Sequence, residues 1–281
     1  MKRKTQLPPL AYGQFLNSVL LGLYRSSDFP TRLRLLTNLE RFSGSRRLQA
    51  RTRYGFVMAV DREDLIQRSV LNDGVWEDEC SEAIRRELRP DDVFFDIGSN
   101  VGYHSLLALA AGVRRVIAFD PDPLNCSVFK LNLMLNNWVN GECSIQQCAL
   151  SDQEGENQFY RSTLKNVGLS GLTPRDVVDS FAVKTKTIDA MIERGEIPLP
   201  TVMKLDVEDW ESRVLAGCRQ LFRTSPPRAV FFENNPDCEA NERDKIWSIF
   251  KDAGYSIIRV EDRESVFHNN YVAKSYGDSS R

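Results

Sequence analysis

The sequence predicts an α/β fold in which helices cover both faces of a mostly parallel sheet, preceded by a basic helical extension. From residue 54 onward, short β-rich runs alternate with helical patterns, which is typical of such sheets. The apolar run Val93-Phe94-Phe95-Asp96-Ile97 is typical of a buried central strand. Residues 1–53 carry 11 Lys/Arg against 2 Asp/Glu, a charge of +9, whereas the rest of the chain carries 26 against 37, a charge of −11. We therefore expect a basic amphipathic helical extension at 1–53 and a sheet domain at 54–281.

The composition indicates a soluble globular protein. The 281 residues are 42% hydrophobic and 27% charged, and no apolar run is long and clean enough to span a bilayer. The six cysteines form no Cys-x-x-Cys pair, and neither His104 nor His268 has a cysteine or histidine at ligand spacing. A structural zinc site is therefore not expected, and the thiols are expected to be reduced in a cytoplasm.

The basic extension is expected to be helical rather than a signal peptide. Leu16, Val19, Leu20 and Leu23 follow helical spacing, two prolines and three polar residues interrupt the apolar stretch, and no small-x-small cleavage site follows it. We expect the extension to dock on the main domain or on a second subunit in a homo-oligomer. The alternative is an anionic partner, either a membrane surface contacted peripherally or a phosphate-bearing substrate.

Each element of the sheet domain follows from apolar patterning. Strands are expected at 54–60, 93–97, 116–119, 144–150, 202–205 and 228–233, with 255–260 and 270–276 as a closing antiparallel pair. Helices are expected at 78–88 and at 102–111. Three further helices are indicated by apolar residues at helical spacing: Leu124, Val128, Leu131 and Leu135; Val214, Leu215, Cys218 and Phe222; and Ile246, Ile249, Phe250 and Ala253, the last ending at Gly254. Residues 151–183 form a looser polar stretch.

A glycine motif follows the first central strand. Residues 96–102 read D-x-G-x-x-x-G and lead directly into a predicted helix. Gly98 permits a tight turn with no Cβ in the way of a ligand, and Gly102 permits close packing of helix on strand. Because ligands of open α/β sheets bind at the carboxyl ends of the strands, this turn is a candidate ligand site. An ordinary βα turn is the alternative.

A carboxylate at the end of the next strand narrows the choice of nucleotide. Asp120 lies 22 residues beyond Gly98, where an acidic residue can accept both hydroxyls of a ribose. Asn100 stands where a dinucleotide fingerprint needs its second glycine, and the carboxylate of Asp96 would repel a pyrophosphate but attract the ammonium and sulfonium of S-adenosylmethionine. No P-loop motif occurs. The pattern favours S-adenosylmethionine over NAD.

These motifs in this order resemble the FkbM-type methyltransferases over roughly residues 54–275. The matching segments are 61–64, 74–77, 96–103, 120–123, Asn132, Asn136, 149–152, 204–208 and 232–233. The resemblance implies a Rossmann-like class I methyltransferase sheet with S-adenosyl-L-methionine as cofactor, wrapped at its methionine part by 98–102, held at its ribose by Asp120 and bordered at its adenine by 149–152. The expected cofactor-binding residues are Glu77, Asp96, Gly98, Ser99, Asn100, Gly102, Tyr103, Asp120, Pro121, Asp122, Ala149, Leu150 and Asp152.

The chain departs from the family pattern after Glu208. The family usually continues Lys-x-Asp-x-Glu with glycine, whereas Asp209 and Trp210 follow here. Asp209 is expected to cap the next helix, and Trp210 to stand at the mouth of the acceptor pocket, where it could stack on a ring or a sugar face.

Three carboxylates are expected to converge beside the cofactor. Asp206 and Glu208 follow one strand and Glu233 ends its neighbour, and crowded like charges raise at least one pKa, which suits a general base. We expect Asp206 to be the base, with Glu208 orienting it or fixing Lys204. The alternative is that Asp206 and Glu208 only hold loops and caps. No third ligand for a divalent ion is visible beside Asp206, so no metal is expected.

The expected function is S-adenosylmethionine-dependent O-methylation of a hydroxyl on a small molecule, a glycan or a lipid-linked acceptor. The alternative is a non-catalytic adenosyl-binding or membrane-docking module that keeps the fold. Nucleic acid is not expected as a partner, because the sheet domain is acidic and lacks interleaved aromatic and basic residues. His104 is expected to be a helix-start residue near the cofactor or at a subunit contact, and both it and His268 are weaker candidates for the base.

Overall fold

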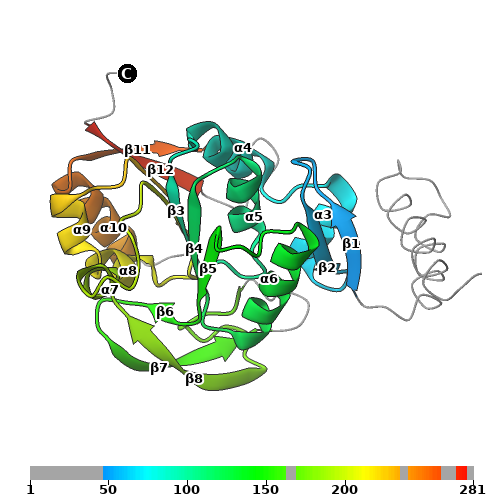
Figure 1. Cartoon of the computed structure of the whole chain (residues 1–281). Coiled ribbons are helices and arrows are strands. Elements are labelled where there is room, and N and C mark those ends of the chain that lie inside the picture. The colour runs from blue at the N-terminus through cyan, green and yellow to red at the C-terminus, as the bar shows by residue number, and fades with distance from the viewer. Residues whose placement is uncertain (1–46, 163–168, 235–239, 261–269, 277–281) are drawn as a thin grey trace, which may run out of the picture. The chain divides into compact units, whose positions relative to one another are not determined.

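The computed structural model describes residues 47–162, 169–234, 240–260 and 270–276 (Figure 1). It divides the chain into two compact units, Met1–Trp76 and Glu77–Arg281. Within the first unit, β1 (Arg47–Arg51) pairs antiparallel with β2 (Val57–Asp61), and α3 (Leu65–Asp73) follows. No described helix is long and apolar enough to cross a membrane.

The end of the basic extension is a strand. Residues 47–51, expected to be helical, form β1, in which Leu48 and Ala50 are buried while Gln49 between them is exposed. This two-residue alternation is the period of a strand with one buried face. The strand was missed because residues 1–53 were treated as one basic segment. The remainder of the predicted helical extension, 1–46, lies outside the described residues.

The second unit is built on a seven-stranded sheet with the order β11-β12-β10-β9-β3-β4-β5. Its strands are β3 (Val93–Ile97), β4 (Arg115–Phe119), β5 (Cys143–Gln146), β9 (Val202–Leu205), β10 (Ala229–Glu233), β11 (Tyr255–Arg259) and β12 (Asn270–Ser275). The pairs β5·β4, β4·β3, β3·β9 and β9·β10 are parallel, whereas β12 runs antiparallel to both β10 and β11. The predicted parallel sheet and its antiparallel closing pair are confirmed.

Helices cover both faces of this sheet. They are α4 (Asp78–Glu87), α5 (Tyr103–Ala110), α6 (Pro123–Leu135), α7 (Ile188–Glu193), α8 (Glu211–Ala216), α9 (Arg219–Thr224) and α10 (Ala240–Asp252). Figure 1 shows α5 and α6 on one side of the sheet and α8 to α10 on the other. Phe95 and Ile97 of β3 pack in one buried cluster with Leu215 and Phe250, so the alternate residue Asp96 points toward α5.

A second sheet includes much of the stretch at 151–183 that was expected to be loosely structured. It has the order β6-β8-β7 and consists of β6 (Ala149–Leu150), β7 (Gly155–Arg161) and β8 (Asp179–Lys186). The single strand expected at 144–150 is therefore wrong, because β5 and β6 belong to different sheets. Most residues of β7 and β8 are exposed or half-buried, so their sequences lack the apolar signal of a buried strand.

Two helices differ from their predicted patterns. In α6, Leu124 and Leu131 are 58% and 40% exposed, and the helix instead buries Phe129 against the glycine loop, where a Cβ at Gly102 would overlap its ring. The helix expected through residues 214–222 is two helices, α8 and α9. They are separated near Gly217, whose backbone lies too close to the carbonyl of Ser151 to accept a side chain.

Candidate active site

The glycine loop between β3 and α5 packs closely on the neighbouring strand ends. Gly98 has φ +79°, and a Cβ there would overlap the carbonyl oxygen of Asp206. The amides of Gly98 and Ser99 both donate to the carbonyl of Phe119 at 3.0 Å. The loop is thus fixed between β4 and β9, and glycine is required at its first turn.

Asp96 begins this loop as a buried carboxylate. It is 1% exposed and accepts a 2.6 Å hydrogen bond from the Ser105 hydroxyl through Oδ2. Asp96 is in register with Lys204, which lies on the adjacent strand β9. Burial raises the pKa of Asp96, although the Lys204 ammonium and the Ser105 hydroxyl oppose the shift.

Several acceptor atoms around the loop are buried without a hydrogen-bond partner among the described residues. They are Asp96 Oδ1, Ser99 Oγ and Asn100 Oδ1. A buried polar atom left unsatisfied costs about 1–3 kcal/mol, so a group of them in one loop indicates a site shaped for a polar ligand. A ligand that carries hydrogen-bond donors would satisfy these acceptors.

Asp120 is held at the end of β4 by backbone amides. Its Oδ2 accepts from Asn100 N and its Oδ1 from Asp122 N, each at 2.8 Å, and the amide of Asn125 lies 3.3 Å from Oδ1. Burial raises the pKa of Asp120 to about 7, despite these hydrogen bonds to the ionised form. The ionised carboxylate retains lone pairs that could accept ribose hydroxyls.

The other predicted cofactor residues have internal partners of their own. Asp122 caps α6 by accepting from Leu124 N at 2.8 Å and forms a 2.9 Å ion pair with Arg161. The hydroxyl of Tyr103 accepts from Ser81 at 3.4 Å. Ala149 and Leu150 are buried in the hydrophobic clusters, Asp152 lines a groove between α8, α9 and α10, and Pro121 is half-buried. Direct cofactor contact by these residues stays a prediction.

The three expected carboxylates do converge. One oxygen from each of Asp206, Glu208 and Glu233 lies within 4.8 Å of the other two. The Nζ of Lys204 lies 2.7 Å from Asp206 Oδ2, and its side chain is only 7% exposed. Burial would lower the pKa of Lys204, but the carboxylates of Asp206 and Asp96 outweigh it and hold this pKa above its ordinary value.

Arg175, which the sequence analysis did not single out, fixes the turn after β9. Its guanidinium lies 3.1 Å from Glu208 Oε2 and also pairs with Asp209. Glu208 therefore pairs with this arginine, and the expectation that it fixes Lys204 is wrong. Both acidic residues have positive φ, 55° and 66°, and at position 209 the family's usual glycine adopts such a conformation without strain.

Burial, followed by the carboxylates of Asp206 and Glu233, raises the pKa of Glu208 to about 9. The Arg175 guanidinium opposes this shift without cancelling it, so the raised pKa favours the protonated form of the carboxyl at neutral pH. Asp206 lies beside it in the same cluster and is held by Lys204. The site thus pairs a protonated acid with a carboxylate that a buried cation orients.

The predicted cap at Asp209 is wrong. α8 begins one residue later, its N-cap position is Trp210, and no side chain caps it there. Glu211 instead reaches back and accepts from Val207 N at 2.9 Å. The indole of Trp210 donates to Ser151 Oγ at 3.3 Å and packs against both hydrophobic clusters, so much of its surface is already in contact.

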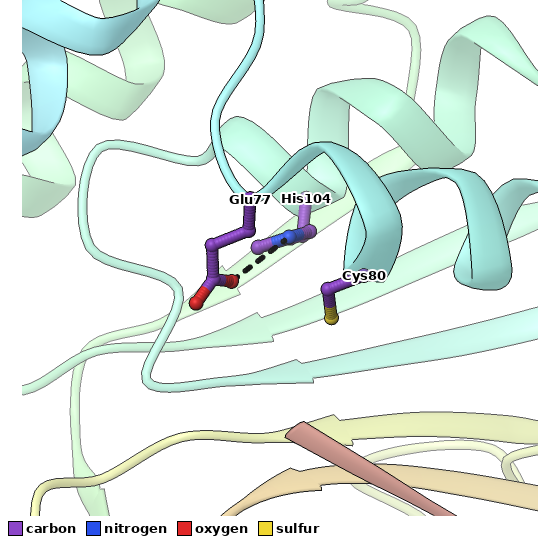
Figure 2. Close-up of side chains that lie close together, drawn as sticks. All are labelled: Glu77, Cys80 and His104. Atoms are coloured by element: carbon purple, nitrogen blue, oxygen red, sulfur yellow. Dashed lines mark ion pairs between the residues drawn. The ribbon is translucent and has the colours of Figure 1, made fainter. Parts of the chain in front are cut away.

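A further polar cluster was missed because its members come from separate helices. Glu77 at the start of α4, Cys80 one turn on and His104 in α5 each offer a ligand atom within 4.8 Å of the others (Figure 2). Only the spacing of Glu77 and Cys80 could have signalled this cluster in the sequence. His268, the weaker candidate for the base, lies outside the described residues.

The parallel sheet, the glycine loop after β3 and the acid after β4 define a Rossmann-like α/β fold of the class I methyltransferase type. The family model described as "Methyltransferase FkbM domain" matches residues 96–257, and the chain belongs to this family.

Two relatives and one solved structure illustrate the similarity. The "Hexuronic acid methyltransferase AglP" of Haloferax volcanii is 31% identical over 131 residues, which is 47% of this chain and 52% of that protein. The "31-O-demethyl-FK506 methyltransferase FkbM" of Streptomyces tacrolimicus is 32% identical over 174 residues, 51% of this chain and 65% of that protein. The chain thus spans less than two thirds of the length of either relative. A crystal structure of a methyltransferase FkbM from Methylobacillus flagellatus KT aligns over 94% of this chain and 59% of that chain, at 16% identity and a TM-score of 0.49.

Proposed function

We propose that this chain is an S-adenosylmethionine-dependent O-methyltransferase that acts on a hydroxyl of a small molecule or a glycan. The observation that carries the proposal is the group of buried, unpartnered acceptors in the glycine loop beside the amide-held carboxylate of Asp120. Gly98 to Gly102 would hold the methionine part, Asp96 would face its positive charges, and Asp120 would accept the ribose hydroxyls. Bound S-adenosylmethionine supplies a methyl group activated by a positively charged sulfur.

Asp206 is the residue best placed to remove a proton from an acceptor hydroxyl. Its carboxylate is fixed by Lys204 at 2.7 Å and is 26% exposed, so it is both oriented and accessible. Glu208 holds its own proton at neutral pH, because its pKa is raised to about 9, and can donate a hydrogen bond to the neighbouring carboxylates. Glu233 completes the acidic cluster and disfavours ionisation of Glu208.

The acceptor class is supported by the chemistry of the cluster and by the relatives' names. Carboxylate bases suit the removal of a hydroxyl proton as the methyl group is transferred. One relative is named as a methyltransferase of a hexuronic acid and the other as a methyltransferase of 31-O-demethyl-FK506, whose name refers to a methyl group on oxygen. A sugar or a polyol-type hydroxyl is therefore the substrate class we favour, with lipid-linked glycans included.

The test is transfer of a labelled methyl group from S-adenosylmethionine to a panel of uronic acids, neutral glycans and polyhydroxylated natural products. We expect a product with at least one class, and a loss of about 10²-fold or more in turnover for Asp206→Asn with cofactor affinity unchanged. Binding of cofactor without transfer to any acceptor would favour the alternative, an adenosyl-binding module. Asp91→Asn is the matched control, since this exposed acid precedes β3 at the amino end of the strand and lies outside the carboxylate cluster.

We also propose that residues 1–53 contact a second subunit or an anionic surface, because their charge of +9 contrasts with −11 elsewhere. Light scattering and vesicle co-sedimentation of the full chain, with and without residues 1–46, test this role. If removal of residues 1–46 changes neither the mass in solution nor vesicle binding, the segment has neither role.

A further inference from the structure

The cluster of Glu77, Cys80 and His104 joins the beginnings of two helices. Glu77 precedes the first turn of α4, Cys80 lies three residues later on the same face, and His104 is the second residue of α5. Figure 2 shows the three side chains converging, with the imidazole directed at the carboxylate. Because α5 begins directly after Gly102, the cluster lies at the end of the glycine loop.

His104 brings an unused acceptor into this cluster. The residue is 4% exposed, and its Nε2 has no hydrogen-bond partner among the described residues. Glu77 Oε2 lies 3.8 Å from this nitrogen, beyond hydrogen-bond distance, and Glu77 Oε1 accepts from Asn270 Nδ2 at 3.2 Å. A buried nitrogen left in this way costs free energy unless a ligand bonds to it.

The charges around the cluster favour a cationic hydrogen-bond donor. Burial, and secondarily the Lys204 ammonium, lowers the pKa of His104 well below its ordinary value, so the ring is neutral and can present a lone pair at Nε2. Burial and the Glu77 carboxylate raise the pKa of Cys80, which keeps it a thiol. Glu77 and His104 therefore offer two acceptors, one of them charged. The Lys204 ammonium would repel a cation bound there, and the carboxylates of Asp206, Asp96 and Glu77, which raise the pKa of Lys204, offset that repulsion.

Lys204 relates this cluster to the proposed cofactor site. The pKa of Lys204 is raised by both Asp96 and Glu77, and its ammonium in turn lowers the pKa of His104, so all four groups share one low-dielectric neighbourhood. Asp96 begins the glycine loop expected to hold the methionine part of the cofactor. The nearest cationic donor in that part is its α-ammonium group.

The separation of the two acceptors distinguishes an ammonium from a metal ion. Two hydrogen bonds of about 2.8–2.9 Å from one nitrogen place their acceptors about 3.5 to 4.7 Å apart, which includes the observed 3.8 Å. A tetrahedral zinc ion would place oxygen and nitrogen ligands about 3.3 Å apart and would require a thiolate at Cys80.

We propose that the Glu77 carboxylate and the His104 imidazole together bind the α-ammonium of the cofactor's methionine part, with Nε2 of His104 as the second acceptor. This inference rests on the proposed function. It assigns a cofactor contact to His104, which neither the glycine motif nor Asp120 implies.

Calorimetry with two ligands tests the proposal without any measurement of activity. The ligands are S-adenosylhomocysteine and its desamino analogue, in which hydrogen replaces the ammonium and the carboxylate is kept. We expect the wild type to bind S-adenosylhomocysteine about 10- to 100-fold more tightly than the analogue, and His104→Leu and Glu77→Gln to lose most of this ratio while their affinity for the analogue stays within about threefold. His104→Gln, whose amide oxygen can reach the position of Nε2, should recover part of it.

Each other outcome overturns the proposal in a recognisable way. Equal affinity of the wild type for the two ligands would exclude an ammonium site whether or not any variant folds. An unchanged ratio in His104→Leu would remove His104 from the site. Stoichiometric binding of Zn²⁺ that is lost in Cys80→Ser, with no discrimination between the ligands, would reassign the cluster to a metal. Absence of S-adenosylhomocysteine binding in the wild type would instead refute the proposed cofactor itself.

Discussion

The Nζ atom of Lys204 lies 2.7 Å from the Oδ2 atom of Asp206 at the carboxyl end of β9. Lys204 is also in register with Asp96 on β3, so one buried ammonium compensates two carboxylates of the proposed site. Removing a single member of a buried charge group leaves the others uncompensated. The proposed catalytic carboxylate of Asp206 and the stability of the carboxyl ends of β3 and β9 are therefore linked.

Replacing Lys204 by methionine should lower the free energy of unfolding by about 3 kcal/mol, because Asp96 and Asp206 lose their counter-charge. Urea denaturation measures the loss. Lys186→Met is the control: this lysine also forms a 2.7 Å ion pair, with Glu196, but both side chains are about a third exposed, and the change should be within about 1 kcal/mol. Equal effects of the two substitutions would contradict this role of Lys204.

Gly98→Ala should be far more destabilising than Gly112→Ala. Both glycines have positive φ, 79° and 86°, so each substitution incurs about 1–2 kcal/mol of backbone strain. Only at Gly98 would the new Cβ overlap a backbone atom, the carbonyl of Asp206, whereas nothing lies within 4 Å at Gly112. Thermal unfolding of the two variants should differ by at least about 2 kcal/mol, and a smaller difference would argue against the close approach of β9 to the loop.

Arg175→Met should destabilise the turn after β9 by about 1–2 kcal/mol, because the arginine pairs with two acids that have positive φ. Adding Asp209→Gly should recover about 1 kcal/mol, since glycine adopts φ 66° without strain and removes an uncompensated charge. The control is Asn137→Gly, at another residue with positive φ, 59°: its stabilisation should be the same with and without Arg175, whereas Asp209→Gly should stabilise Arg175→Met more than it stabilises the wild type. Denaturation of the double variants measures this coupling.

The stability of the wild type should fall as pH rises between about 7.5 and 8.5. The pKa of Glu208 is about 9 in the folded protein against an ordinary 4.5, so in this range the folded state holds a proton that the unfolded state has lost. The slope of the free energy of unfolding against pH should be smaller in Glu208→Gln than in the wild type. Glu154→Gln is the control, because pairing with Arg194 lowers the pKa of that carboxyl and it does not titrate there. A slope that Glu208→Gln leaves intact would exclude the protonated carboxyl.

The parts of the fold that the sequence predicted are those with continuous apolar runs. The strands at 93–97 and 202–205 were placed to the residue, because every residue in them is buried. The strands at 155–161 and 179–186 were missed because water covers much of their surface and they retain polar residues. Of the predicted stripe on α6, Val128 is buried but Leu124 and Leu131 are exposed, because the buried face is set by contact with the glycine loop. This face includes the polar Asn132, a donor to Val101 O at 2.9 Å.

The candidate site shows the same division. Asp96, Asp120 and Asp206 could be singled out as candidates because each lies in or just after a recognisable strand, and the carboxyl ends of parallel strands lie side by side. His104 and Arg175 could not be weighted correctly, since their importance comes from tertiary contacts between separate segments. The partner of Glu208 was misassigned because Lys204 is nearer in sequence.

The most direct test of the central claim is calorimetric titration of the full chain with S-adenosylhomocysteine at pH 8, where the carboxylate of Asp120 is mostly ionised. We expect saturable binding of one molecule per chain, weakened at least tenfold in Asp120→Ala, with weaker binding below pH 7 in the wild type as this group is protonated. An absence of binding, or an affinity that Asp120→Ala leaves unchanged, would contradict the assignment of this site to the methyltransferase cofactor.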